Sequence, residues 1–131
     1  MADQLETQWA PRVLSITRII AALIFMEHGT SKLLGFPAGP FTPEAMTLPW
    51  IAGILEIVGG ALLLVGLFTR PVAFVLSGLM AFAYWLAHAP KSVFPLLNGG
   101  DAAILFCFLF LYIACAGGGP WSVDAIWRRK K

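Results

Sequence analysis

The segment FMEHGTSKLLGF, residues 25–36, places Glu27, His28 and Lys32 within six positions at the end of a mostly apolar run. Ionisable side chains inside such segments are costly to desolvate, and in membrane proteins they mark functional positions by default. The same kinds of side chain recur further along the chain, at Glu56, His88 and Asp101. Carboxylate and imidazole groups hydrogen-bond carbonyl or hydroxyl groups and exchange protons, so these are the reactions that the six residues could support.

The composition indicates an integral membrane protein. Of 131 residues, 59% are hydrophobic and 12% are charged, whereas soluble domains average roughly 25% charged residues. Four apolar segments approach the roughly 20 residues needed to span a hydrocarbon core, namely 12–34, 49–68, 71–89 and 100–116. The two residues between the second and third segments force these to run antiparallel. The sequence therefore predicts one all-α domain over residues 1–131, a membrane-embedded antiparallel four-helix bundle with an interfacial tail at 117–131.

Basic residues are distributed unevenly between the two ends of this bundle. One end carries seven of them, Arg12, Arg18, Arg70, Arg128, Arg129, Lys130 and Lys131. The other end carries Lys32 and Lys91. Because basic residues favour the cytoplasmic side, we expect a multi-pass protein of the inner (plasma) membrane with both termini in the cytoplasm.

The net charge of +2 gives no indication of nucleic-acid binding. Tryptophans and basic residues in the tail favour contact with membrane lipids.

Counting residues along the predicted helices places six ionisable side chains in the outer half of the membrane, namely Glu27, His28, Lys32, Glu56, His88 and Asp101. Glu56 has small neighbours one turn away on either side, at Ala52, Gly53, Gly59 and Gly60. A stripe of small residues allows close helix packing, so Glu56 is expected within a helix–helix seam, where a buried carboxylate needs a partner or a proton. Arg18 is expected lower, as a structural counter-charge or a contact of lipid headgroups.

Several of these residues also have simpler interpretations. We expect Lys32 to extend to the interface as an anchor, while Glu27 meets Glu56 or an inward-facing cation. His88 could be an interfacial histidine, and Asp101 could cap the fourth helix. A metal site formed by carboxylates and histidine matches no standard spacing, so we expect no metal and no covalent cofactor. The apolar loop 89–100 is expected to fold onto the bundle as a lid.

A polar pocket in the outer half, edged by aromatic residues, would suit a lipid-soluble ligand with carbonyl or hydroxyl groups, such as a quinone. The ligand-binding residues are then predicted to be Glu27, His28, Lys32, Glu56, His88 and Asp101.

Four ordered patterns make the chain resemble the DoxX family of small four-helix membrane proteins. They are RIIAALIFMEHGTSKLLGF, IAGILEIVGGALLLVGLFTRPVA, AHAPKSVFPLLNGGDAAILFCFLFLY and GGGPWSVD. The positions that match family motifs are His28, Gly29, Lys32, Glu56, Gly66, Leu67, Thr69, Arg70, His88, Asn98, Gly99, Gly100, Ser122 and Asp124. One departure is Asp101, where the family usually has Glu. The shorter side chain favours a capping role there.

The resemblance implies a quinone-linked membrane role. Some members of the family are subunits that feed electrons to quinone, and others accompany quinone stress responses or thiol and superoxide defence proteins. We therefore expect a subunit or accessory of a quinone-linked oxidoreductase that belongs to a larger membrane complex or a homo-oligomer. The alternative is a non-catalytic structural subunit of a respiratory or photosynthetic complex. A transporter is less favoured, because four helices enclose little volume.

Overall fold

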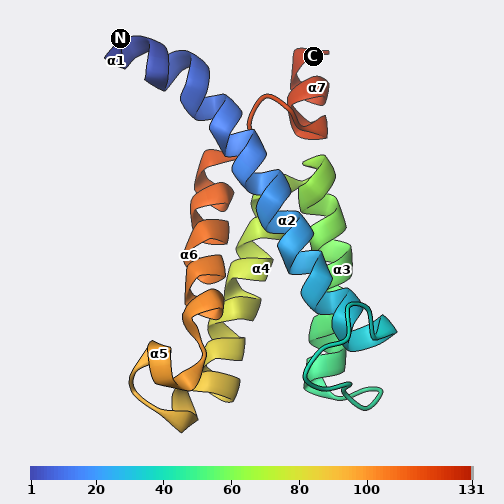
Figure 1. Ribbon diagram of the computed structural model, residues 1–131. Coiled ribbons are helices and arrows are strands. Elements are labelled where there is room, and N and C mark those ends of the chain that lie inside the picture. Colours follow the sequence, from blue (N-terminus) through green and yellow to red (C-terminus); the bar gives the residue numbers. More distant parts are fainter. Residues whose placement is uncertain (131) are drawn as a thin grey trace.

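The computed structural model describes residues 1–130, and all regular structure in that range is helical. The segments that precede the first long helix are α1 (Ala2–Gln4) and a π-helical turn (Leu5–Trp9). The four long helices are α2 (Ala10–Leu34), α3 (Leu48–Val65), α4 (Thr69–Ala83) and α6 (Asp101–Ala116). The short ones are α5 (Pro95–Asn98) and α7 (Val123–Arg129), and turns over Tyr84–His88 and Ala89–Lys91 extend α4. The predicted all-α membrane bundle is confirmed (Figure 1).

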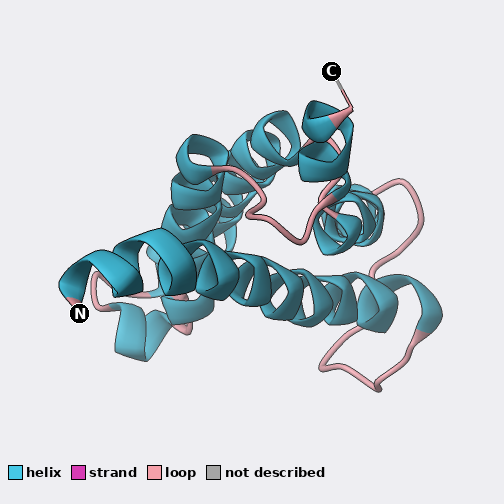
Figure 2. Cartoon of the chain, turned by 90° about the horizontal axis from the view of Figure 1, so that it is seen from above, coloured by secondary structure: helices cyan, strands magenta, loops and turns pink. Residues whose placement is uncertain are grey.

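Three helical stretches, Ala2–Leu34, Leu48–Val65 and Thr69–Lys91, are long and apolar enough to cross a membrane, and α6 is a shorter apolar helix. Both chain termini lie at one end of the bundle, which we call the terminal end (Figure 1). The opposite end, formed by the loop 35–47 and by the segment 84–100 with its short helical turns, is the distal end. Helix α2 is tilted across the other helices in both views (Figures 1 and 2).

The turn between α3 and α4 comes earlier in the chain than the sequence indicates and contains three residues, 66–68, instead of two. Helix α3 ends at Val65 instead of 68, because Gly66 adopts a left-handed conformation with φ of 72°. Phe68 is also left-handed, with φ of 51°, and α4 begins at the next residue, Thr69. Glycine takes this conformation without a Cβ penalty, so Gly66 sets the point at which the chain reverses.

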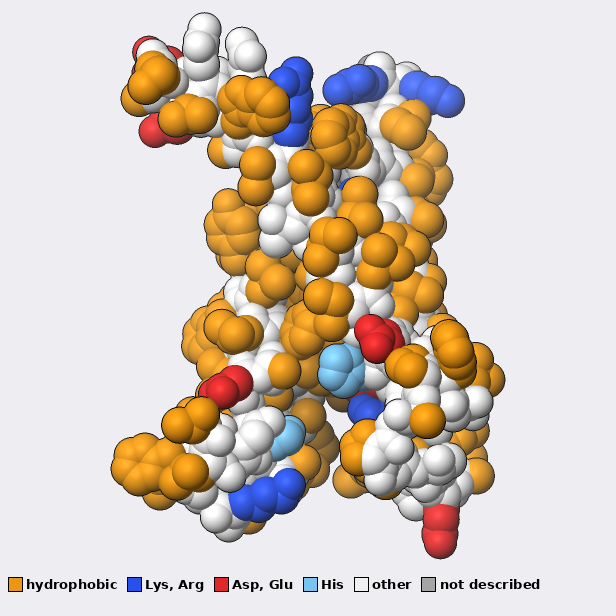
Figure 3. Space-filling view, viewed as in Figure 1, with side chains coloured by type: hydrophobic (Ala, Val, Ile, Leu, Met, Phe, Trp, Pro, Cys, Tyr) orange, Lys and Arg blue, Asp and Glu red, His pale blue; other side chains and the backbone are white. Residues whose placement is uncertain are grey.

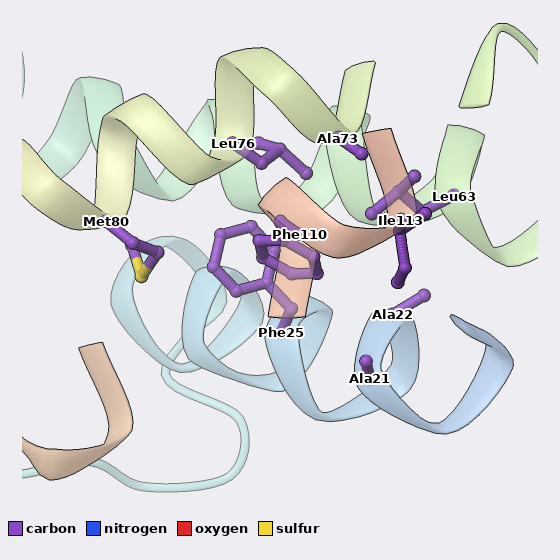
Figure 4. Close-up of a cluster of buried hydrophobic side chains, with 9 residues drawn as sticks. All are labelled: Ala21, Ala22, Phe25, Leu63, Ala73, Leu76, Met80, Phe110 and Ile113. Atoms are coloured by element: carbon purple, nitrogen blue, oxygen red, sulfur yellow. The ribbon is translucent and has the colours of Figure 1, made fainter. Parts of the chain in front are cut away.

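The helices associate as two closely packed pairs, α2 with α3 and α4 with α6. Between the pairs lies a core of buried apolar side chains (Figure 4), namely Ala21, Ala22, Phe25, Leu63, Ala73, Leu76, Met80, Phe110 and Ile113. Phe25 of α2 meets Phe110 of α6 edge-on, with ring centroids 4.9 Å apart. The aromatic contact joins the two pairs at mid-height.

Close approach within the first pair depends on glycine. A Cβ on Gly29 of α2 would lie 2.7 Å from the carbonyl oxygen of Gly53 and 2.7 Å from Ile57 Cγ1, both in α3. These are closer than van der Waals contacts allow, and a backbone oxygen cannot rotate away. The backbones of α2 and α3 therefore pack together only with glycine at this position.

Arg18 holds the terminal end together. Its side chain is fully buried, and its guanidinium donates to four backbone carbonyls. Two belong to the last turn of α3, Leu63 and Leu64 (2.7 Å for the latter). The others belong to the segment after α6, Gly118 at 2.9 Å and Trp121 at 2.6 Å. The expectation of a headgroup contact for Arg18 is wrong, because the side chain is inaccessible; its role is structural.

Two further polar contacts lie at the same end, one between the tail and α4 and one between α4 and α6. Asp124 accepts hydrogen bonds from the backbone N–H groups of Phe68 (2.9 Å) and Thr69 (2.8 Å), at the start of α4. Arg70 donates to the carbonyls of Ala114 and Cys115 in the last turn of α6. Each side chain satisfies backbone groups that a helix end leaves without an internal partner.

Replacing Gly29 with alanine should separate α2 from α3. We expect Gly29→Ala to lower the free energy of unfolding by about 1–3 kcal/mol, the usual cost of overpacking. Gly78→Ala in α4 is the control, because a Cβ there meets no described atom within 4 Å. It should be neutral or stabilising by about 0.5–1 kcal/mol. Thermal unfolding in detergent measures both, and equal effects of the two substitutions would contradict the packing described.

Replacing Arg18 tests the contacts at the terminal end. Arg18→Lys keeps the charge but loses the planar fork of donors, so several carbonyls lose their partner. We expect a loss of about 3 kcal/mol or more, since a bond from a charged donor contributes about 1.5–3 kcal/mol. Arg12→Lys is the matched control, because Arg12 is exposed and lies over the Trp9 ring. The same unfolding measurement serves, and an unchanged midpoint for Arg18→Lys would refute the structural role.

Candidate functional site

A buried ion pair joins α2 and α3 toward the distal end. Lys32 Nζ in the last turn of α2 lies 2.6 Å from Glu56 Oε1 in α3. The Glu56 side chain is 3% exposed and that of Lys32 is 23% exposed. The expectation that Lys32 extends to the interface is therefore wrong. The close approach of the backbones at Gly29 and Gly53 brings Glu56 within reach of the lysine.

The second oxygen of Glu56 has no partner. Oε2 is buried, and no donor among residues 1–130 hydrogen-bonds it. A buried acceptor without a donor costs about 1–3 kcal/mol, and such groups are rare in native structures. Glu56 thus has one oxygen bound by Lys32 and a second that lacks a hydrogen-bond donor among the described residues.

His28 lies one helical turn before Lys32 on α2. Its ring is exposed, and Nδ1 hydrogen-bonds the carbonyl of Ile24 at 2.9 Å. The ring also meets Phe106 of α6 edge-on, with centroids 6.2 Å apart. With Nδ1 engaged, Nε2 is the nitrogen that remains for an outside partner. His28 therefore lies where α2 faces the second helix pair.

Glu27 does not join the ion pair. Its side chain is exposed, whereas that of Glu56 is buried and pairs with Lys32, so the expected contact with Glu56 is not formed. The backbone carbonyl of Glu27 accepts a bond from the Thr30 hydroxyl at 3.1 Å. Glu27 thus remains a residue of the outer surface of α2.

His88 belongs to a separate polar cluster on the other helix pair. Its Nδ1 lies 3.0 Å from the carbonyl oxygen of Asn98. The buried Asn98 side chain donates to the carbonyl of Ser92 (2.9 Å) and the hydroxyl of Tyr84 (3.3 Å), and accepts from Gly100 N–H (2.8 Å). These bonds fix the conformation of the segment between α4 and α6. Asn98 was missed as an organising residue, although the motif Asn98–Gly99–Gly100 contains it.

Asp101 is the first residue of α6 and is exposed. Its carboxylate suits the positive end of the helix dipole, and no side-chain capping bond forms at this helix start within the described range. The structure therefore brings together Lys32 and Glu56, places His28 beside them on α2, and leaves Glu27, His88 and Asp101 with other neighbours.

The loop 89–100 does not form the expected lid. Its apolar side chains point outward, with Val93 87%, Leu96 82% and Leu97 71% exposed. Asn98 fixes the loop by its buried side chain, which turns the intervening apolar residues away from the bundle. The distal end is consequently forked in the space-filling view, and histidine, acidic and basic side chains gather around the notch (Figure 3).

A second hollow lies at the terminal end, where the sequence predicted none. It is an open groove of about 600 Å³ beside the turn between α3 and α4. No group of three or more His, Cys, Asp or Glu side chains in the described part of the chain lies close enough to hold a metal ion.

The helices and the buried ion pair define a small polytopic membrane protein with a polar site inside an apolar bundle. The family model for DoxX matches residues 13–89. The chain belongs to the DoxX family.

Curated relatives extend the match over most of the chain. An uncharacterized protein of Haemophilus influenzae is 41% identical, over 89% of this chain and 92% of its own length. Inner membrane protein YqjF of Escherichia coli is 28% identical, over 88% of this chain and 92% of its own. Inner membrane protein YphA of the same organism is 29% identical, over 87% and 89%. No solved structure matches significantly.

A double-mutant cycle would measure how strongly Lys32 and Glu56 depend on each other. Lys32→Met leaves a buried carboxylate unpaired, so we expect it to cost about 3–5 kcal/mol. Adding Glu56→Gln removes that charge and should restore part of the loss. Unfolding of the single and double variants in detergent, with the exposed Glu27→Gln as control, gives the coupling energy. Strictly additive losses would show that the pair is not coupled.

Proposed function

We propose that this DoxX-family protein binds a quinone-like head group at the fork of its distal end, beside the Lys32–Glu56 pair. The observation that carries the proposal is the free Oε2 of Glu56, a buried acceptor that no described residue satisfies. A quinol hydroxyl could donate a hydrogen bond to this oxygen. The membrane itself supplies such lipid-soluble molecules at this depth.

The two charged groups suit the two forms of such a ligand. Lys32 Nζ carries three N–H donors, of which one is directed to Glu56 Oε1. The remaining donors could bind a quinone carbonyl oxygen, while the carboxylate accepts from the hydroxyl of the reduced form. His28, with its exposed ring, could pass protons between the site and the surface. Electrons would be exchanged with a partner protein, so the chain would act as a subunit or accessory of a quinone-linked oxidoreductase.

The proposed setting is the inner membrane, where the names of the relatives YqjF and YphA place those two proteins. Among the described residues, six basic side chains lie at the terminal end and two, Lys32 and Lys91, at the distal end. The positive-inside rule therefore favours both termini in the cytoplasm. The quinone site would then lie in the outer half of the bilayer. A larger membrane complex or a homo-oligomer would bring the redox partner to it.

The test is a titration of the purified protein in detergent with decylubiquinone, a short-chain quinone, followed by calorimetry. We expect saturable binding that Glu56→Gln weakens about 10–100-fold, the effect of losing a bond to a charged acceptor. Glu44→Gln, in the exposed distal loop, should bind like the original protein.

Unfolding midpoints of the same samples show whether Glu56→Gln remains folded. Unsaturable binding, or equal affinity in folded Glu56→Gln and the original protein, would refute the proposal.

A further inference from the structure

The groove at the terminal end has properties that the quinone proposal does not use. It lies between the turn that joins α3 to α4 and the tail helix α7, with a volume of about 600 Å³. Arg70, Arg128 and Lys130 supply three cations to its lining, and Asp124 supplies one carboxylate. Two positive charges (three minus one) are therefore unmatched within the groove.

The carboxylate is already committed to the fold. Burial alone would raise the pKa of Asp124, but hydrogen bonds from the backbone N–H groups of Thr69 and Phe68, together with the nearby charge of Arg128, outweigh that effect. The pKa is consequently below its ordinary value, and Asp124 is ionised at neutral pH. Because its oxygens bind the start of α4, Asp124 does not neutralise the groove. Arg70 uses only Nη1 for the carbonyls of Ala114 and Cys115, so its other nitrogens, together with Arg128 and Lys130, can attract an outside anion.

The floor of the groove is kept open by glycines. A Cβ on Gly118 would lie 2.8 Å from the Thr69 hydroxyl oxygen, and one on Gly117 would lie 3.4 Å from Arg70 Nη2. Thr69 is 1% exposed, and its hydroxyl has no hydrogen-bond partner of normal geometry within residues 1–130. With glycine at 117 and 118, only backbone lies beside the buried Thr69 hydroxyl and the Arg70 guanidinium, and no side chain stands between either group and the groove.

The other wall is aromatic. Trp127 of α7 and Phe68 meet edge-on with ring centroids 6.1 Å apart, and each is more than half exposed. Tryptophan is enriched at the level of lipid headgroups, where one part of the ring is apolar and another is wet. The groove therefore combines a cationic side with an apolar side at the end of the membrane-spanning helices.

We propose that this groove binds the phosphate of an anionic glycerophospholipid, with the glycerol and upper acyl chain against Phe68 and Trp127. The cations of Arg70, Arg128 and Lys130 attract the headgroup, and the Thr69 hydroxyl donates to a phosphate oxygen. This site is independent of the quinone site, because it lies at the opposite end of the bundle.

Native mass spectrometry of the detergent-solubilised protein tests the proposal, since no membrane surface potential contributes there. Phosphatidylglycerol should be retained in preference to phosphatidylcholine. Arg128→Gln should weaken phosphatidylglycerol binding about five-fold, the usual effect of one basic residue at an anionic surface. Arg12→Gln is the matched control, a cation of the same end that lies over Trp9 and outside the groove.

Thr69→Val provides a second variant that leaves every charge in place. It should weaken phosphatidylglycerol binding while leaving the unfolding midpoint unchanged or higher, because the lost hydroxyl has no bond within the chain. Equal retention of the two lipids, or equal losses for Arg12→Gln and Arg128→Gln, would overturn the proposal. So would displacement of the lipid by inorganic phosphate at equal concentration, which would show a simple anion site.

Discussion

The fold depends on how one buried guanidinium is satisfied. Arg18 lies in the interior of an apolar bundle, where an unpaired charge would be prohibitively costly, and its four acceptors are backbone carbonyls. These carbonyls belong to the end of α3 and to the segment after α6. The chain must therefore bring both segments to α2, which closes the terminal end. The distal end has no equivalent contact within the described residues, and there the two helix pairs diverge.

Two buried charges in the same bundle thus have different roles, and their hydrogen bonds distinguish them. Each of the three guanidinium nitrogens of Arg18 donates to a carbonyl within the chain, and the side chain is fully buried, so no ligand can reach it. Glu56 uses one oxygen for Lys32 and leaves the other without a partner. Buried polar atoms in native structures are nearly always hydrogen-bonded, and this exception is the observation on which the proposed binding site depends. The same reasoning applies on a smaller scale to the Thr69 hydroxyl at the terminal end.

Much of the fold could be predicted from the sequence, because apolar segment length and turn length constrain a membrane bundle strongly. The position of Glu56 in a helix seam could also be predicted, since glycines one turn away on either side allow only close packing. Lys32 could not be placed in this way. Whether a lysine near a helix end extends to the interface or pairs inward depends on how near the facing carboxylate lies, and that distance is set by the α2–α3 approach. The outward direction of the loop 89–100 likewise depends on Asn98. Its side chain bonds Tyr84, Ser92 and Gly100, and these positions follow no helical or strand repeat that a sequence pattern would reveal.

The hydrogen-bond partners of Arg18 could not be predicted from the sequence for another reason. Sequence patterns reveal pairs of opposite charge, but backbone carbonyls have no sequence signature, and every residue carries one. The glycine-rich segment after α6 indicates a turn without indicating which side chain it will receive. The groove at the terminal end could not be predicted for the same reason, since its walls come from three separate segments.

The central claim is that the distal fork, beside Glu56, holds a quinone head group. The most direct measurement is photolabelling of native membranes with an azidoquinone, followed by peptide mapping of this chain. The account predicts that labels concentrate in the distal parts of α2 and α3, within residues 24–33 and 52–60, and are displaced by excess unlabelled quinone. Labels confined to the terminal end, or labels that excess quinone does not displace, would contradict it.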